Sequence, residues 1–326
     1  MAPKAGEAVS TLWSAVGWAV ITPLAIFAGA HVLQLDETSS VLLLGAALLP
    51  WLCPPALAVL LIALRWGHPL LAVVAAAAAG VLVASAVSGL GVPVRARPPA
   101  GAFVTVRLFT ANVHHTNPQV GRIAEEIRAV APDLVALQEV DPDGVAQLRR
   151  SGMLERYPYS LIETRKGASG IGLWSRYPLR DAQVLDGGGM PFIRATVLFG
   201  PRRLRLYTVH TVAPLDGDRA RWRAQLQRVG EAIEDERGPL VLAGDFNATR
   251  WHPSFRRILS NRLADAHEER GRGWAATWPR GRRLLPPLMR LDHVLVSRDI
   301  GVRSIREGLG QGSDHRPIIA ELALIT

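Results

Sequence analysis

The chain lacks the means to cross-link itself, and long parts of it lack charge. Its 326 residues include one cysteine, Cys53, so no disulfide framework is possible. Three segments contain no Asp, Glu, Lys or Arg, and each could cross a hydrocarbon core of about 30 Å as a helix. A cleaved signal peptide has a single, shorter apolar region. The sequence therefore predicts a retained membrane anchor with spans at about 12–35, 41–64 and 70–90.

Prolines and sparse charges bear on the topology of this anchor. Three prolines between residues 50 and 55 predict a break or kink in the second span, because proline removes a donor and clashes with the preceding turn. A re-entrant hairpin there is the alternative, and it would reverse the topology downstream. Lys4 and Arg65 flank one predicted side, and the loop 36–40 on the other side is acidic. The positive-inside rule therefore predicts a multi-pass protein of the cell membrane with everything after the third span outside the cytoplasm.

We divide the chain into an anchor (1–91), a linker rich in proline, glycine and arginine (92–102), and one globular domain (103–326). Only four of the 37 lysines and arginines and three of the 28 acids lie in the first 100 residues. The remainder thus carries a net charge of about +8. Such a surface suits nucleic acid and anionic lipid head groups alike, and charge alone does not choose between them.

The globular part has strand-like and helix-like patterns in turn. Residues 104–110, 203–211 and 240–243 have strand character, and residues 120–130 and 218–236 have helical spacing. Many strands, fewer helices and polar residues at the strand ends predict an α/β fold. In this fold two packed sheets lie between outer helices, with a site at one rim.

Carboxylates follow apolar, strand-like runs in four strings: Gln138-Glu139, Gly244-Asp245-Phe246-Asn247, Arg290-Leu291-Asp292-His293 and Ser313-Asp314-His315. A hard ion such as Mg²⁺ takes one or two protein carboxylates, and Glu139 is the best single candidate. Asp245 could orient a water while Asn247 contacts a phosphate oxygen. Asp292 could fix the tautomer of His315. Each string alone also fits an ordinary strand end or turn. Together they predict a metal-assisted phosphoryl-transfer site.

The ordered set of motifs over about 220 residues resembles the endonuclease/exonuclease/phosphatase superfamily. It comprises Asn112, Gln138-Glu139, His210, Asp245-Phe246-Asn247, Asp292 and Ser313-Asp314-His315. The resemblance implies a four-layered α/β sandwich and Mg²⁺ as the usual ion, with Mn²⁺ as an alternative. It implies Asn112, Glu139 and Asp314 as metal ligands, and catalytic roles for His210, Asp245, Asn247, Asp292 and His315.

Two points limit this transfer of roles from the family to the chain. Whether His315 or Asp245 takes the proton from water stays open. Ala111 before Asn112 and Thr208-Val209 before His210 depart from the family's usual residues, which weakens the assignment of His210 most. His114, His115, His252 and His267 are given no role.

Three spans followed by an outward catalytic domain are similar to the membrane-bound teicoplanin-resistance proteins of the VanJ type. This resemblance implies an extracytoplasmic hydrolase of a lipid-linked phosphate or pyrophosphate, such as undecaprenyl pyrophosphate, associated with teicoplanin resistance. The alternatives are an exported metal-dependent nuclease or phosphodiesterase, and a protein that only binds an envelope precursor or antibiotic. A membrane tether argues against nucleic acid as a partner, and a pure binder needs no carboxylate-oriented histidine. No obligate protein partner is inferred.

The stretch 274–289 mixes basic and apolar side chains in a proline-rich loop. It contains Arg280, Arg282 and Arg283 together with Trp278, Leu284, Leu285, Leu288 and Met289. This composition suits an anionic membrane interface. A solvated loop whose leucines pack back on the domain is the alternative.

Overall fold

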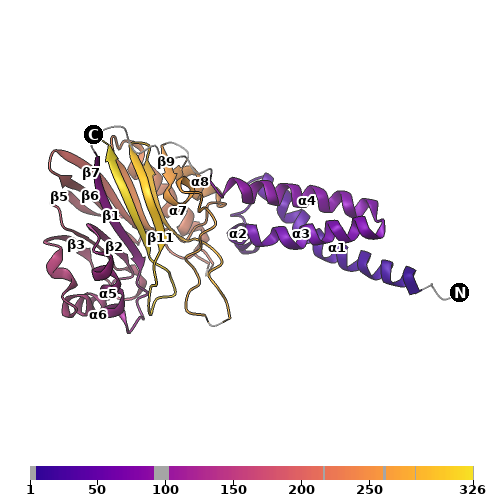
Figure 1. Cartoon of the computed structure of the whole chain (residues 1–326), viewed down its shortest axis with the longest axis horizontal. Helices are drawn as coiled ribbons and strands as arrows, with labels where there is room; N and C mark the ends of the chain where they lie inside the picture. The colour runs from indigo at the N-terminus through magenta and orange to yellow at the C-terminus, as the bar shows by residue number, and fades with distance from the viewer. Residues whose placement is uncertain (1–4, 92–102, 216, 260–261, 283, 326) are drawn as a thin grey trace. The chain divides into compact units, whose positions relative to one another are not determined.

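The computed structural model describes residues 5–91, 103–215, 217–259, 262–282 and 284–325 (Figure 1). The predicted linker, 92–102, lies outside these residues. Two units are distinguished: Met1–Gly89 with Arg250–Pro253, and Leu90–Thr249 with Ser254–Thr326. We call them the anchor unit and the catalytic unit.

The anchor unit is helical, with α1 (Ala5–Val32), α2 (Ser40–Ala47), α3 (Leu49–Trp66) and α4 (Pro69–Ser88). Three apolar stretches, Val9–Val32, Leu49–Trp66 and Pro69–Ser88, are long enough to cross a membrane. The chain therefore has three N-terminal helices that could anchor it, as expected.

The second predicted span differs from the structure at its start. Residues 41–64 do not form one helix, because α2 ends at Ala47 and α3 begins at Leu49. Pro50 lies in the first turn of α3, where a missing N–H breaks no intrahelical bond. Pro54 and Pro55 lie inside α3, which continues through them to Trp66. Pro50 thus lies at the start of a helix that contains Pro54 and Pro55, and the break falls just before the proline cluster.

The anchor unit also contains a short segment from far along the chain, Arg250–Pro253. The Trp251 indole Nε1 donates to the backbone carbonyl of Ser85 at 3.0 Å. The Nε2 of His252 lies 3.1 Å from the backbone oxygen of Leu43, and the His252 side chain is buried. His252 therefore has a structural role in this unit.

The catalytic unit contains two six-stranded sheets. The strand order of the first is β11-β12-β1-β2-β4-β3, and that of the second is β5-β6-β7-β8-β10-β9. The first sheet comprises β1 (Phe103–Asn112), β2 (Leu134–Gln138), β3 (Tyr159–Glu163), β4 (Ile171–Ser175), β11 (Ile300–Glu307) and β12 (Ile318–Ile325). The second comprises β5 (Leu179–Asp186), β6 (Pro191–Phe199), β7 (Arg202–His210), β8 (Leu240–Asp245), β9 (Leu263–Asp265) and β10 (Asp292–Ser297).

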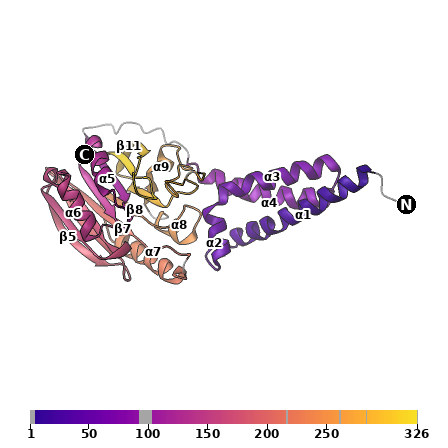
Figure 2. The same ribbon diagram turned by 90° about the horizontal axis from the view of Figure 1, so that it is seen from below.

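Helices cover the outer faces of the two sheets (Figure 2). They are α5 (Val120–Val130), α6 (Pro142–Arg150), α7 (Arg219–Glu234) and α8 (Pro253–Leu259). The short α9 (Ala266–Glu269) instead contributes Ala266 to the apolar core between the sheets. The apolar stripe of α5, with Ile123 and Ile127, packs on Phe109 and Leu137 of the first sheet. On the second sheet, Tyr207 donates its hydroxyl to the Ala232 carbonyl of α7. The predicted layered α/β sandwich is confirmed.

Candidate active site

The candidate site lies at one edge of the sandwich, where the inward-facing side chains of the strands change from apolar to polar. Val106 and Leu108 of β1 lie in the core between the sheets, whereas Phe109 and Ala111 pack on the outer helices. Because side chains alternate along a strand, Asn112 shares the inward face of Leu108. The same parity applies to His210 after Leu206, Asp245 after Ala243 and Asp292 before Val294. The sheets thus hold an apolar core and a polar edge.

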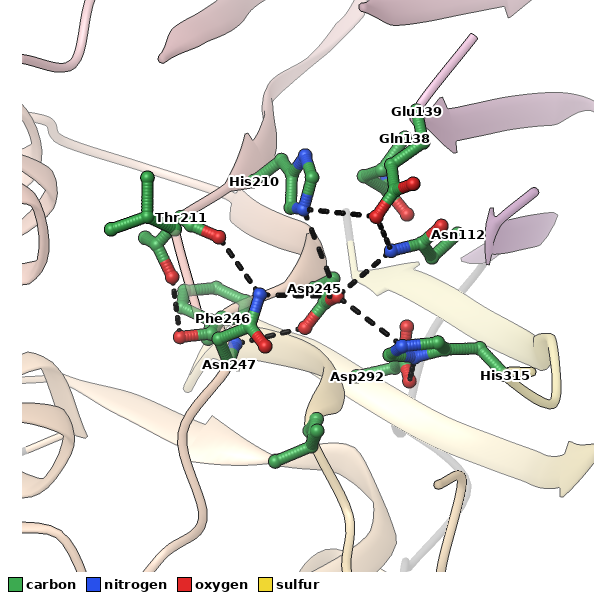
Figure 3. A network of polar contacts seen from close by, with 12 residues as sticks. Asn112, Gln138, Glu139, His210, Thr211, Asp245, Phe246, Asn247, Asp292 and His315 are labelled. Carbon is green, nitrogen blue, oxygen red and sulfur yellow. Dashed lines mark hydrogen bonds and ion pairs between the residues drawn. The ribbon is translucent and has the colours of Figure 1, made fainter. Parts of the chain in front are cut away.

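Strand directions explain why these side chains share that edge. β1 and β2 are parallel, as are β7 and β8, so all four end there. β12 is antiparallel to β1 and β10 is antiparallel to β8, so both begin there. The register places Asp245 opposite His210 on one side and opposite Asp292 on the other. Residues more than 200 positions apart in the chain therefore meet (Figure 3).

Asn112 joins the two sheets at the site. Its Nδ2 donates to Glu139 Oε1 at 2.8 Å and to Asp245 Oδ2 at 3.0 Å. Asn112 is buried, and its amide accordingly binds a carboxylate from each sheet. The side chain of Glu139 is 12% exposed and that of Asp245 is 1% exposed. Glu139 is therefore the carboxylate of this pair with more access to solvent.

His315 pairs with Asp292 below this bridge. Its Nδ1 lies 2.8 Å from Asp292 Oδ2, and its Nε2 lies 3.7 Å from Asp245 Oδ2. The backbone N–H of His315 donates to Ser313 Oγ, which donates in turn to the Asn112 carbonyl. The Asp292 carboxylate therefore fixes which ring nitrogen faces Asp245. The second oxygen of Asp292, Oδ1, is buried and has no hydrogen-bond partner within the described residues.

His210 and Asn247 complete the network around Asp245. The Nε2 of His210 lies 3.8 Å from both Glu139 Oε1 and Asp245 Oδ2. The backbone N–H of Asn247 donates to Asp245 Oδ1, and its amide Nδ2 donates to the Thr211 carbonyl. Seven predicted side chains are thus brought together. The eighth, Asp314, accepts a hydrogen bond from the Trp278 indole at its Oδ2.

Several backbone positions at the site are unusual. Glu139, Asn247 and His114 have positive φ angles, which side-chain-bearing residues rarely adopt. Gly244 also has a positive φ, and a Cβ there would lie 2.0 Å from the Val209 carbonyl oxygen. Only glycine lets β7 approach Asp245 so closely. Such positions concentrate where the surrounding structure holds functional groups in place.

The pKa values of the two acids diverge. Burial opposes ionisation of Glu139, but nearby His210 and hydrogen bonds from His115 and Asn112 outweigh it and lower its pKa to about 2. Burial raises the pKa of Asp245, with Asp292 adding repulsion and His315 opposing the rise. Burial also opposes the charge of His315, yet Asp292 and Asp245 raise the pKa of His315 to about 10. The network thus holds a fixed anion, an acid of raised pKa and an imidazolium.

Two groups of side chains offer ligand atoms that suit a divalent ion. Asp245, Asp292 and His315 offer ligand atoms within 4.8 Å of one another. Protonated His315 has no free lone pair, however, so ligation there requires loss of the charge that both carboxylates stabilise. Glu139, ionised and more accessible, beside the Asn112 amide, meets the preference of hard ions for oxygen without that loss. The donor chemistry favours the Glu139 side.

The sequence reasoning did not include His115, which lies at the site. Its backbone N–H and its Nδ1 both contact Glu139 Oε2, at 3.0 and 2.7 Å. The signal available was its place in the turn after β1, three residues beyond Asn112. His115 orients Glu139 from the side opposite Asn112.

Residues 109–315 match the sequence model of the Endonuclease/Exonuclease/phosphatase family. No curated protein sequence matches the chain.

Solved structures match the catalytic unit in fold. Humanized TDP2 from D. rerio has 17% identity, a TM-score of 0.59, and covers 67% of this chain and 98% of its own. An endonuclease/exonuclease/phosphatase from Beutenbergia cavernae has 24% identity and a TM-score of 0.55, over 68% of this chain and 72% of its own. The 3' phosphatase NExo from Neisseria, solved with a product DNA hairpin, has 21% identity and a TM-score of 0.55. It covers 66% of this chain and 98% of its own.

Proposed function

Because the chain belongs to the Endonuclease/Exonuclease/phosphatase family, whose members are metal-dependent phosphoesterases or nucleases, we propose that this hydrolase acts on a membrane lipid. The proposed substrate is a lipid-linked phosphate or pyrophosphate, hydrolysed outside the cytoplasm. The observation that carries this proposal is the presence of three possible spans in the chain that bears the site. A tethered enzyme gains most from a substrate held in the same bilayer. The resemblance to teicoplanin-resistance proteins extends the proposal to an envelope carrier such as undecaprenyl pyrophosphate.

In the proposed mechanism, Glu139 would hold the divalent ion, with Mg²⁺ as the expected choice. Asn112 could ligate the ion only through its Oδ1, which here accepts from the backbone N–H of His114. When bound, such an ion neutralises charge on the phosphoryl group. The hydrogen bonds from His115 and Asn112 orient the Glu139 carboxylate for this role. The Asp314 carboxylate, bound to Trp278, is a weaker ligand candidate than the sequence resemblance implied.

Asp245 is our choice of base. An attacking water forms a bond to phosphorus as the bond from phosphorus to the leaving oxygen breaks, and its proton passes to Asp245. A base works best when its pKa lies near the working pH, and burial raises the Asp245 pKa in that direction. His315, kept cationic by Asp292, then faces the phosphoryl oxygens with its Nε2. We therefore assign the role of base to Asp245 and not to His315.

Asn247 and His210 flank the same position. The Asn247 amide is held by Thr211, which orients it beside Asp245. His210 lies equally far from Glu139 and Asp245, so it could donate to an oxygen placed between them. We propose both as contacts of the phosphoryl group.

Nuclease activity is the second candidate. It is favoured by the basic composition of the catalytic unit and by solved neighbours that include D. rerio TDP2 complexed with single strand DNA product. The discriminating experiment is hydrolysis by the full chain, purified in detergent, of undecaprenyl pyrophosphate, a sphingomyelin-like lipid and duplex DNA compared side by side. The products followed are inorganic phosphate, the phosphorylated head group and DNA fragments, respectively. Hydrolysis of lipid alone supports the proposal. Preference for DNA would replace it with the nuclease.

A further inference from the structure

The loop 279–288 is closed at its base beside the site. The backbones of Trp278 and Met289 exchange hydrogen bonds in both directions at 3.0 Å, so the intervening residues leave and return at one point. We call residues 279–288 the closed loop. Arg283 lies outside the described residues.

Several contacts attach the base of the closed loop to catalytic segments. The Trp278 indole donates to Asp314 Oδ2, and the backbone N–H of Arg280 donates to the Asp314 carbonyl at 2.7 Å. The Arg280 guanidinium donates to the Gly310 carbonyl at 2.7 Å. Thr277 Oγ1, just before the loop, accepts from the backbone N–H of Asp292. Arg280 therefore stabilises the base of the closed loop, and it is not available to bind head groups as the sequence suggested for all three arginines.

The far part of the closed loop exposes apolar side chains. Leu284 is 94% exposed and Leu285 is 43% exposed, and Arg282 between the base and these leucines is also exposed. Leu309, on the neighbouring segment that Arg280 braces, is 63% exposed. Their exposure excludes, for Leu284 and Leu285, the alternative in which the leucines of this loop pack back on the domain, whereas Leu288 is half-buried. Exposed apolar side chains beside an exposed arginine indicate a binding surface.

We propose that Leu284 and Leu285 insert into the lipid interface while Arg282 pairs with anionic head groups. The closed loop would then hold the active site at the membrane surface. This inference rests on the proposed lipid substrate. A bilayer is the favoured occupant because the same chain has three possible spans, and the catalytic unit begins at Leu90, two residues after the third of them ends at Ser88. The cationic residue beside two leucines matches an anionic interface in charge and in polarity. Leu284 is more exposed than any other large apolar residue among those described.

The single cysteine makes a direct test practical. Cys53→Ser removes it, and the serine Oγ can replace Cys53 Sγ as donor to the Leu49 carbonyl. In that full-length background, Leu284→Cys is labelled with an environment-sensitive fluorophore and reconstituted in vesicles containing anionic lipid, with and without nitroxide-labelled acyl chains. Leu215→Cys is the matched control, because Leu215 is 47% exposed and lies between β7 and α7.

The expected result is a blue-shifted emission at position 284 that nitroxide lipids quench, with neither change at position 215. An unshifted label at 284 overturns the proposal. A shifted label that nitroxide lipids do not quench also overturns it, because the loop is then covered by protein. The readout needs no turnover, so failure of the proposed activity would not be mistaken for failure of the interface.

A second measurement connects the surface to catalysis. The double variant Leu284→Ser with Leu285→Ser should lower turnover of a vesicle-embedded lipid phosphate about tenfold and leave hydrolysis of a soluble phosphodiester within about twofold of the parent. Leu215→Ser should change neither. Equal losses on both substrates would place the leucines in the support of the site and overturn the interface assignment.

Discussion

Replacing Asp292 with Asn tests whether the charge of His315 matters for the reaction. The two groups lie 2.8 Å apart and are buried, and Asp292 is the main group that raises the His315 pKa. With charge centres about 4 Å apart and an effective dielectric constant of about 20, their attraction is about 4 kcal/mol. That energy corresponds to roughly three pKa units. Asn keeps the shape and removes the charge, so the His315 pKa should fall from about 10 to roughly 7.

The assay is the rate of hydrolysis of a soluble phosphodiester by the full chain in detergent, followed against pH. In the parent, the rate should rise as Asp245 loses its proton and stay level until His315 loses its own, near pH 10. In Asp292→Asn, the alkaline fall should begin near pH 7. At pH 9 the variant should therefore be slower by about 100-fold, with a much smaller loss at pH 6.5.

Asp314→Asn is the matched control. The Asp314 carboxylate also raises the His315 pKa, but less than Asp292 and Asp245 do. Its removal should move the alkaline fall only slightly. If Asp292→Asn lost the same factor at every pH, Asp292 would not act through the charge of His315, and the proposed mechanism would be refuted.

Other variants test the remaining assignments. Glu139→Ala or excess chelator should abolish turnover while the fold survives by circular dichroism; full activity in either case would exclude Glu139 as the metal ligand. Asp245→Asn and His315→Ala should each lose at least about 100-fold, and the double variant should lose less than the product, unless they act independently. His115→Ala should raise the metal concentration for half-maximal rate about tenfold, since Glu139 loses one donor; an unchanged titration would contradict that role. A phosphatase reporter fused after Thr326 should be active in intact cells, and a reporter active only in the cytoplasm would reverse the topology.

Local patterns were sufficient to predict much of this fold. The helix over 120–130 matches α5, because its apolar residues recur at helical spacing and form one buried stripe. The strand ends at Asn112 and Asp245 could be predicted because an apolar run stops where a polar residue begins. Asp292, expected after an apolar run, instead begins β10. By contrast, β5 was not predicted. It is largely exposed, so its sequence shows no alternation of buried and exposed residues.

The sequence by itself determined the order of the chemical groups, the uncharged N-terminal segments and the layered α/β class, because periodicity and composition are local properties. The tertiary structure alone decided which groups touch. Asn112 bridges Glu139 and Asp245 because parallel and antiparallel pairings bring their strand ends to one edge, and no local pattern encodes that register. It also decided the charges, since burial and the Asp292 carboxylate separate the pKa values of Asp245 and His315 from those of free side chains. Proximity and desolvation are properties of the folded chain.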